Sequence, residues 1–195
     1  ASCSAVCRPS PRPRPLDIDG VLHPAAADAA APATEAACSG DGDGRFLTEC
    51  LEHLCRLLKE TGACIVLSSS WRLHPQHFAE ARQRLGEWGI GVHDATPCLG
   101  RRGRAAEILA WLAEHSDEVE SFVVLDDMDL LGSPEGPFLG NGCIPVNGDT
   151  GLATSDVERA SAVLLAGTAT RQSTFSASPP CCEAFSRLPR VFDVG

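Results

Sequence analysis

The sequence contains no tyrosine, one methionine and a single lysine, Lys59, against fifteen arginines. It also lacks an apolar run of membrane-spanning length. Acidic residues outnumber basic ones, and the formal net charge of -10 argues against non-specific binding to nucleic acid or to an anionic membrane, although a local basic patch is compatible with it. With 44% apolar and 22% charged residues, the 195-residue chain is expected to form one soluble globular domain.

The ten cysteines include no CxxC pair, which argues against a zinc site. Cys50, Cys55 and Cys64 fall within apolar helix or strand patterns, where a free thiol behaves as a small hydrophobic side chain. We therefore expect reduced, mostly buried thiols in an intracellular, cytoplasmic protein rather than a disulfide framework. The Arg- and Ser-containing, acid-free segment 1–15 is similar in composition to an organelle transit peptide, so organelle targeting is the alternative location.

Three segments have compositions that do not favour regular structure. Residues 1–15 are rich in Pro and Arg and indicate a linker or a targeting remnant. Residues 24–44 are rich in Ala, Asp and Gly and indicate a low-complexity insertion. Residues 167–195 are rich in Ser, Pro, Thr and Cys and indicate a disordered tail. The folded domain is therefore expected to span residues 16–166.

Within this domain, strand-like apolar runs alternate with segments of helical apolar spacing. Because strands and helices alternate, we expect an α/β fold, with a mainly parallel sheet covered by helices on both faces in a Rossmann-like three-layer sandwich. A first strand should precede Asp17, although Pro13 and Pro15 lack the amide hydrogen that a sheet ladder needs. The expected strands lie at 63–67, 90–93, 121–125 and 143–146, and the expected helices at 45–60, 75–88, 104–115 and 154–165.

Two carboxylates, Asp17 and Asp19, stand two residues apart where the first strand should end. Period-two geometry puts them on the same side of the backbone, and Gly20 then allows a sharp turn. Carboxylates this close repel one another unless a cation lies between them, which favours a divalent metal with oxygen ligands. A plain surface turn is the alternative for this segment alone, because Asp and Gly are common turn residues.

Polar residues also follow two later strands: Ser68 comes after 63–67, and Asp126 and Asp127 come after 121–125. Ligands of parallel sheets bind beyond the carboxyl ends of the strands. We therefore expect these side chains to converge with the carboxylates that follow the first strand.

The segments Asp17 to Leu22, Val66 to Arg72, Arg104 to Leu112 and Leu125 to Asp127 occur in the order of the four haloacid dehalogenase (HAD) superfamily motifs. Together they resemble the HAD-like domains associated with Swiss-army-knife RNA repair proteins, over about residues 16–166. The resemblance implies a Mg²⁺-dependent phosphatase, that is, a phosphoric monoester hydrolase that works through an aspartyl-phosphate. No folded cap is evident between the motifs, and an open site suits a large phosphorylated substrate, such as a nucleic-acid end, a nucleotide or a phosphoprotein.

The resemblance also assigns roles to single residues. Asp17 is the expected nucleophile, and Asp19 is the expected general acid and then base. Phosphate binding is expected from Ser68, with Ser69 as its competitor, and from Arg104, with Arg101 and Arg102 as alternatives. The expected Mg²⁺ ligands are Asp17, Asp126, Asp127 and the backbone carbonyl of Asp19.

Several alternatives remain open at the level of sequence. The prolines before Asp17 motivate a second hypothesis, a catalytically weak or inactive HAD-like binding module. Asp126 and Asp127 could instead form a helix cap. Arg72 could contact the substrate phosphate or pair with an acid. Trp71 and Trp88 are expected in the core, and no membrane partner is expected.

Overall fold

We analysed a computed structural model of the chain, in which residues 13–16, 18, 20–24 and 46–173 are described. Asp17 and Asp19, nearly all of the predicted insertion 24–44, the segment 1–12 and the tail after residue 173 lie outside the described residues. The fold therefore defines the surroundings of the two predicted catalytic carboxylates through their neighbours in sequence and in space.

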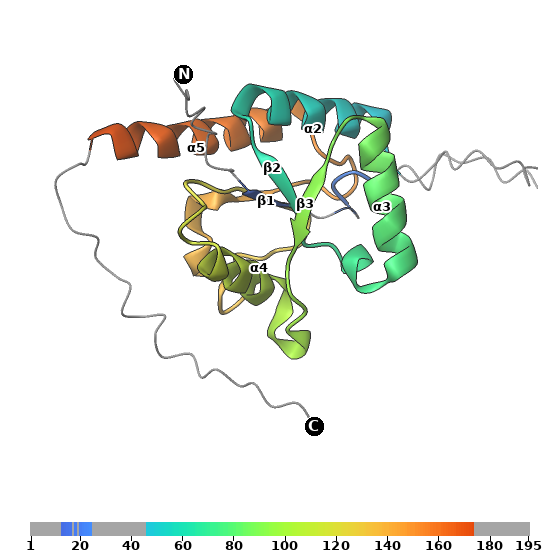
Figure 1. Cartoon of the computed structure of the whole chain (residues 1–195), viewed down its shortest axis with the longest axis horizontal. Helices are drawn as coiled ribbons and strands as arrows, with labels where there is room; N and C mark the ends of the chain where they lie inside the picture. The colour runs from blue at the N-terminus through green and yellow to red at the C-terminus, as the bar shows by residue number, and fades with distance from the viewer. Residues whose placement is uncertain (1–12, 17, 19, 25–45, 174–195) are drawn as a thin grey trace, which may run out of the picture.

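A five-stranded parallel sheet forms the centre of the fold, and its strand order is β3-β2-β1-β4-β5 (Figure 1). This arrangement confirms the predicted α/β fold with a parallel sheet. Strand β1 is the middle strand, with β2 and β3 on one side and β4 and β5 on the other. The carboxyl end of β1 therefore lies where the strand order reverses, which is the crevice where such sheets bind ligands. The strands are β1 (Pro13–Leu16), β2 (Cys64–Leu67), β3 (Val92–Ala95), β4 (Val124–Asp126) and β5 (Cys143–Pro145).

The predicted helices are all present and are named in Figure 1 as α2 (Thr48–Thr61), α3 (Pro75–Glu87), α4 (Gly103–Glu114) and α5 (Thr154–Ser173). Helix α5 extends past the predicted end at residue 165, so residues 167–173 are helical and not part of an unstructured tail. The tail was assigned from its overall composition, whereas its first residues include Ala169, Arg171 and Gln172, which have good helix propensity.

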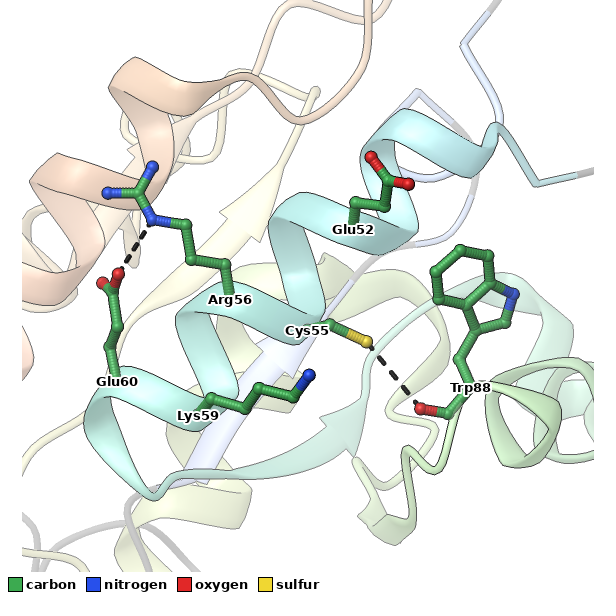
Figure 2. Close-up of a pocket in the computed structure, with 6 residues that line it drawn as sticks. All are labelled: Glu52, Cys55, Arg56, Lys59, Glu60 and Trp88. Atoms are coloured by element: carbon green, nitrogen blue, oxygen red, sulfur yellow. Dashed lines mark hydrogen bonds and ion pairs between the residues drawn. The ribbon is translucent and has the colours of Figure 1, made fainter.

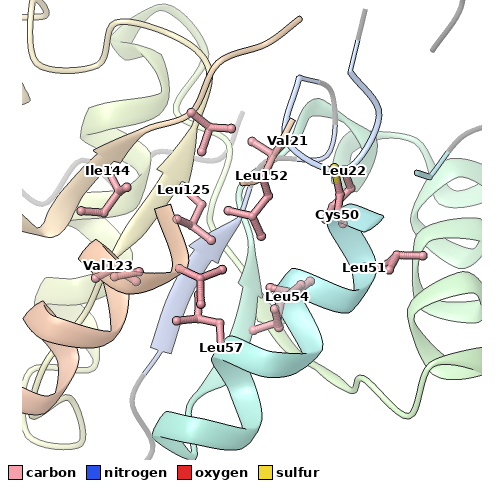
Figure 3. Packing of buried hydrophobic residues seen from close by; sticks show 14 of the residues in the cluster. Val21, Leu22, Cys50, Leu51, Leu54, Leu57, Val123, Leu125, Ile144 and Leu152 are labelled. Carbon is pink, nitrogen blue, oxygen red and sulfur yellow. The ribbon is translucent and has the colours of Figure 1, made fainter. Parts of the chain in front are cut away.

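Val123, which directly precedes β4, and the alternating side chains of β4 divide the core between the two faces of the sheet. Val123 and Leu125 pack with α2 and α5, whereas Val124 packs with Ala105 and Ile108 of α4. In Figure 1, α2 and α5 lie side by side over one face and α4 lies over the other. Figure 3 shows how the apolar stripe of α2 meets the sheet; its buried members are Cys50, Leu51, Leu54 and Leu57.

Strand β1 forms despite its prolines. All four of its residues pair with β2, in the register Pro13↔Cys64 to Leu16↔Leu67, and Leu16 also pairs with Leu125 of β4. The prolines alternate with Arg14 and Leu16, whose amide groups can still donate to the ladder. The pairing on both sides removes the main structural argument for the hypothesis of a damaged first strand.

Candidate active site

The register of the three central strands brings the predicted site residues to one edge of the sheet. Leu16, the last residue of β1, pairs with Leu67 of β2 on one side and with Leu125 of β4 on the other. The next residues along β2 and β4 are Ser68 and Asp126, and both are fully buried. The two polar side chains therefore flank the carboxyl end of β1, directly before the predicted nucleophile in the sequence.

Ser68 and Asp126 both project towards α4. Asp126 lies two residues after Val124, which packs on α4, and side chains two residues apart on a strand share a face. Ser68 lies two residues after Val66, whose register partner Asp94 accepts a 2.6 Å hydrogen bond from the indole of Trp111 on α4. Helix α4 thus covers the side of the sheet from which these polar groups emerge.

Arg104, in the first turn of α4, joins this group of side chains. One of its guanidinium nitrogens lies 2.9 Å from Oδ2 of Asp126, in a salt bridge whose carboxylate is completely buried. The other oxygen of Asp126 accepts a 3.0 Å hydrogen bond from the backbone N–H of Met128. Arg101 and Arg102 are exposed in a 3₁₀ turn before α4, so Arg104 is the arginine of the three that the fold brings to the site.

Asp127 lies at the turn that follows β1. Its carboxyl group occupies the space that a Cβ would need at Gly20, which has a φ of +72°. It also lies against Gly148, in the loop after β5. The turn itself is anchored, because the carbonyl of Ile18 accepts hydrogen bonds from the backbone N–H groups of residues 21–23. Asp127 is therefore held next to the segment that carries the predicted nucleophile.

The two candidate serines have different surroundings. The hydroxyl of Ser69 accepts a hydrogen bond from the backbone N–H of Trp71 and so caps the 3₁₀ turn Ser70–Leu73. The hydroxyl of Ser68 is buried and has no hydrogen-bond partner in the described part of the chain. Because buried hydroxyls nearly always have a partner, Ser68 is the serine that is left for a ligand.

Arg72 holds together the segments at the carboxyl ends of the strands. It also pairs with an acid, which was one of the two alternatives predicted for it. Its guanidinium donates to the carbonyls of Ser68 and Ser69 after β2, to the carbonyls of Thr96 and Pro97 after β3, and to the carboxylate of Glu107 on α4. Arg72 therefore joins three elements of the candidate site.

Glu107 completes that support, a role that was not predicted from the sequence. Its second oxygen accepts a 2.8 Å hydrogen bond from the backbone N–H of Leu99. The side chains of Glu107 and Arg72 are only 9% and 5% exposed, so the ion pair is almost fully removed from water. An acid in the first turns of an otherwise apolar helix face was the signal available in the sequence.

The described carboxylates fit part of a Mg²⁺ site. Asp126 and Asp127 supply the hard oxygen donors that Mg²⁺ prefers, at the edge of the sheet where the metal is expected. In the described part of the chain, no group of three His, Cys, Asp or Glu side chains could hold a metal ion. Asp17 and Asp19, the other two expected contributors, lie outside the described residues. The buried charge of Asp126 is balanced here by Arg104.

The cysteines of the described part of the chain lie in several different environments. Cys50, Cys55, Cys64, Cys98 and Cys143 form no disulfide; Cys50 and Cys143 are buried, while Cys98 is exposed. Burial raises the pKa of Cys143 to about 11, and the negative charges of Asp126 and Asp129 add to the shift. Only Cys50 and Cys143 are buried among the described cysteines, so the expectation of mostly buried thiols is wrong for this part of the chain, whereas their reduced state stays a prediction.

A pocket of about 480 Å³ lies elsewhere, against the outer surface of α2 (Figure 2). It is lined by Trp88 at the end of α3 and by side chains of α2 from Glu52 to Glu60, including the ion pair Arg56–Glu60. Both segments lead into strands, so the pocket lies towards the amino ends of β2 and β3, and it contains none of the predicted site residues. Trp88 is 37% exposed here, so its expected place in the core was wrong, whereas Trp71 is buried as expected.

In the described residues, no helix is long and apolar enough to span a membrane. One protein-family model matches most of the chain. A family model described as "HAD domain in Swiss Army Knife RNA repair proteins" matches residues 16–157. The matched segment runs from the last residue of β1 into α5 and includes every residue of the candidate site. No curated protein matches the chain.

Proposed function

Because this chain belongs to the family of HAD domains in Swiss Army Knife RNA repair proteins, we propose that it is a Mg²⁺-dependent phosphatase acting on phosphate monoesters. The observation that carries the proposal is the convergence of Ser68, Asp126 and Arg104 around the carboxyl end of β1. A hydroxyl and a guanidinium can donate hydrogen bonds to phosphoryl oxygens, and a buried carboxylate beside them can hold the metal ion that offsets their negative charge.

In the proposed reaction, a carboxylate oxygen of Asp17 attacks the phosphorus, and the bond to the ester oxygen breaks. Asp19 gives its proton to the departing oxygen and later takes a proton from the water that hydrolyses the aspartyl-phosphate. Because hydrolysis is divided into two steps, a positioned carboxylate replaces an unactivated water as the nucleophile of the first step. The reaction releases the alcohol and inorganic phosphate and leaves Asp17 and Asp19 in their starting forms.

The remaining residues bind and orient the phosphoryl group. Ser68 donates its hydroxyl proton in a hydrogen bond to one phosphoryl oxygen, and Arg104 places a permanent positive charge beside the same group. Asp126 and Asp127, together with Asp17 and the backbone carbonyl of Asp19, would hold Mg²⁺. When bound, the metal supplies positive charge that offsets the repulsion between the phosphoryl oxygens and the carboxylates.

A nucleic-acid end is the substrate class that we propose within this activity. Between β2 and β4 the described chain contains only α3, β3, α4 and short 3₁₀ turns, without an additional folded unit over the carboxyl edge of the sheet. This part of the chain therefore adds no folded unit that would keep a long substrate from the carboxyl ends of the strands. The description of the matched family, which names RNA repair proteins, supports the same class.

A substrate panel tests the proposal. Purified protein is incubated with aryl phosphates, nucleotides, and oligonucleotides that carry a 3′- or 5′-phosphate, and the released phosphate is measured with Mg²⁺ and after chelation. We expect release that needs Mg²⁺ and is fastest on an oligonucleotide end. Turnover of aryl phosphates without turnover of oligonucleotides would exclude the proposed substrate class, and no release from any of them would favour the binding-module hypothesis.

A further inference from the structure

Two buried hydroxyls at the carboxyl edge of the sheet have no hydrogen-bond partner in the described part of the chain: those of Ser68 and Thr96. Ser68 is completely buried and Thr96 is only 4% exposed. Buried side-chain oxygens without a partner are rare in native proteins, and each one calls for a ligand, a water or a functional reason. The sequence alone did not indicate Thr96 as a candidate site residue.

The two residues are neighbours on adjacent strands. Leu67 of β2 pairs with Ala95 of β3, so Ser68 and Thr96 are the next residues along the two strands, and the N–H of Thr96 donates a 3.0 Å hydrogen bond to the carbonyl of Leu67. The carbonyls of Ser68 and Thr96 both accept from the guanidinium of Arg72, which holds the two backbones together.

Their side chains also share a face of the sheet. Val66 and Asp94 are register partners, and Ser68 and Thr96 follow them by two residues each. Asp94 meets the indole of Trp111 on α4, whereas Ala95 packs on the opposite face with Leu67. Thr96 and Ser68 therefore both project towards α4, in the buried layer that also contains the carboxylate of Asp126.

We propose that Thr96 is a positioning residue for Ser68: its hydroxyl donates, through one buried water, to the oxygen of Ser68, which in turn donates its proton to a phosphoryl oxygen. The proposal rests on the proposed function, because it deepens the phosphate-binding role of Ser68. No covalent bond changes and no proton is transferred. A serine oxygen that accepts a hydrogen bond becomes a better donor, because hydrogen bonds in a chain polarise one another.

Direct contact between Thr96 and the reacting phosphoryl group does not fit the sheet. Thr96 follows β3, which is two strands away from β1. Neighbouring strands are spaced by roughly 5 Å, so Thr96 lies about 10 Å from the axis of β1. A phosphoryl group attached to the residue after β1 can reach Ser68 on the next strand but not Thr96. The structure therefore assigns Thr96 an action through Ser68.

The test compares Thr96→Val, which removes the hydroxyl at nearly constant shape, with Thr96→Ser, which keeps it. Binding of inorganic phosphate to the full chain is measured by calorimetry in Mg²⁺, alongside the melting temperature. We expect Thr96→Val to weaken phosphate binding about tenfold, with a melting temperature close to that of the wild type because the hydroxyl has no direct protein partner in the described part of the chain. Thr96→Ser should bind phosphate within about twofold of the wild type.

Thr61→Val is the matched control, since Thr61 is also 4% exposed but its hydroxyl donates to the carbonyl of Leu57 in α2. That variant should have a lower melting temperature and unchanged phosphate affinity. A second comparison repeats Thr96→Val in a Ser68→Ala background, where the effect on phosphate affinity should disappear because the two residues act as one unit. Equal losses in both backgrounds would overturn the proposal, as would normal binding by Thr96→Val.

The outcomes separate this proposal from the proposed function. If the wild type hydrolyses phosphate monoesters and Thr96→Val binds phosphate like the wild type, the role of Thr96 is wrong and the phosphatase activity stands. If phosphate binds and the two residues are coupled, but no substrate is hydrolysed, the role of Thr96 stands and the phosphatase activity is wrong. A wild-type chain that binds no inorganic phosphate in Mg²⁺ overturns the role of Thr96.

Discussion

Arg72 is the residue on which most of the candidate site depends structurally, although it is not expected to touch the substrate. Its single guanidinium holds the segment after β2, the segment after β3 and the start of α4 in fixed relative positions. The planar fork of arginine suits this task, because its donors point in several fixed directions. Glu107 compensates the charge that this arrangement buries.

Glu107→Gln should therefore be strongly destabilising. The change keeps the size of the side chain but leaves the buried Arg72 charge without a counter-charge, and breaking a buried ion pair in this way costs about 3 kcal/mol or more. Urea unfolding of the variant and the wild type measures the free energy of unfolding. Glu60→Gln is the control, because the Arg56–Glu60 pair is exposed to solvent and its loss should change stability little. Equal effects of the two changes would contradict the structural role of Arg72.

Cysteine reactivity gives a second prediction for single residues. The pKa of Cys143 is raised to about 11, mainly by burial, whereas the thiol of Cys98 is exposed. At pH 8 we expect iodoacetamide to modify Cys98 in the native protein and to leave Cys143 intact, because the thiolate is the reactive form and burial restricts access to it. Mass spectrometry of the digested protein distinguishes the two sites, with urea-unfolded protein as the positive control for Cys143.

The same shift makes stability depend on pH in the alkaline range. The folded protein holds the Cys143 proton more tightly than the unfolded chain does, whose thiol has a pKa near the ordinary 9.0. The contribution to stability is therefore complete below pH 9 and is lost as the pH rises through about 11. Rapid alkylation of Cys143 in the native protein at pH 8 would contradict the burial of its thiol and the raised pKa from which this pH dependence follows.

Among the connecting elements, the turn that directly follows β1 depends on the conformation of one glycine. Gly20 combines a left-handed backbone with the close approach of the Asp127 carboxyl group. Gly62, which ends α2, has a similar φ of +65°, but no other atom lies within 4 Å of the place that a Cβ would take there. The two glycines therefore separate the cost of backbone strain from the cost of displacing an active-site carboxylate.

Gly62→Ala should lower the free energy of unfolding by about 1–2 kcal/mol, the usual cost of a left-handed conformation for a residue with a Cβ. Gly20→Ala carries the same strain and must also push Asp127 away, so we expect a larger loss of stability and a weaker affinity for Mg²⁺. Unfolding in urea and metal titration by calorimetry measure the two effects. Normal Mg²⁺ affinity in Gly20→Ala would show that Asp127 does not contribute to a metal site.

Most of these elements could be predicted from the spacing of apolar residues. The helix that ends at Gly62 and the strand that ends at Leu67 follow directly from periodicity and from a glycine stop signal. Strand β1 was harder, because its prolines contradict strand propensity, and only pairing with the neighbours β2 and β4 shows that it forms. Tertiary pairing outweighed local preference there.

At the scale of the whole molecule, the sheet turns four distant segments into one candidate site. Polar residues after strands were sufficient to predict that Ser68, Asp126 and Asp127 gather at one edge, because every parallel sheet brings its carboxyl ends together. Thr96 and Glu107 could not be found in this way. Their roles depend on the register between β2 and β3 and on the seating of α4, and neither is encoded in a local pattern.

We propose that this convergence makes Asp17 a nucleophile for phosphate monoesters. The most direct measurement compares phosphate release by the wild type and by Asp17→Asn, in the presence of Mg²⁺, on the best substrate of the panel. Asparagine keeps the shape of the side chain but cannot form the aspartyl-phosphate, so we expect a loss of at least about a thousandfold in kcat. Retention of wild-type turnover by Asp17→Asn would contradict the proposed mechanism.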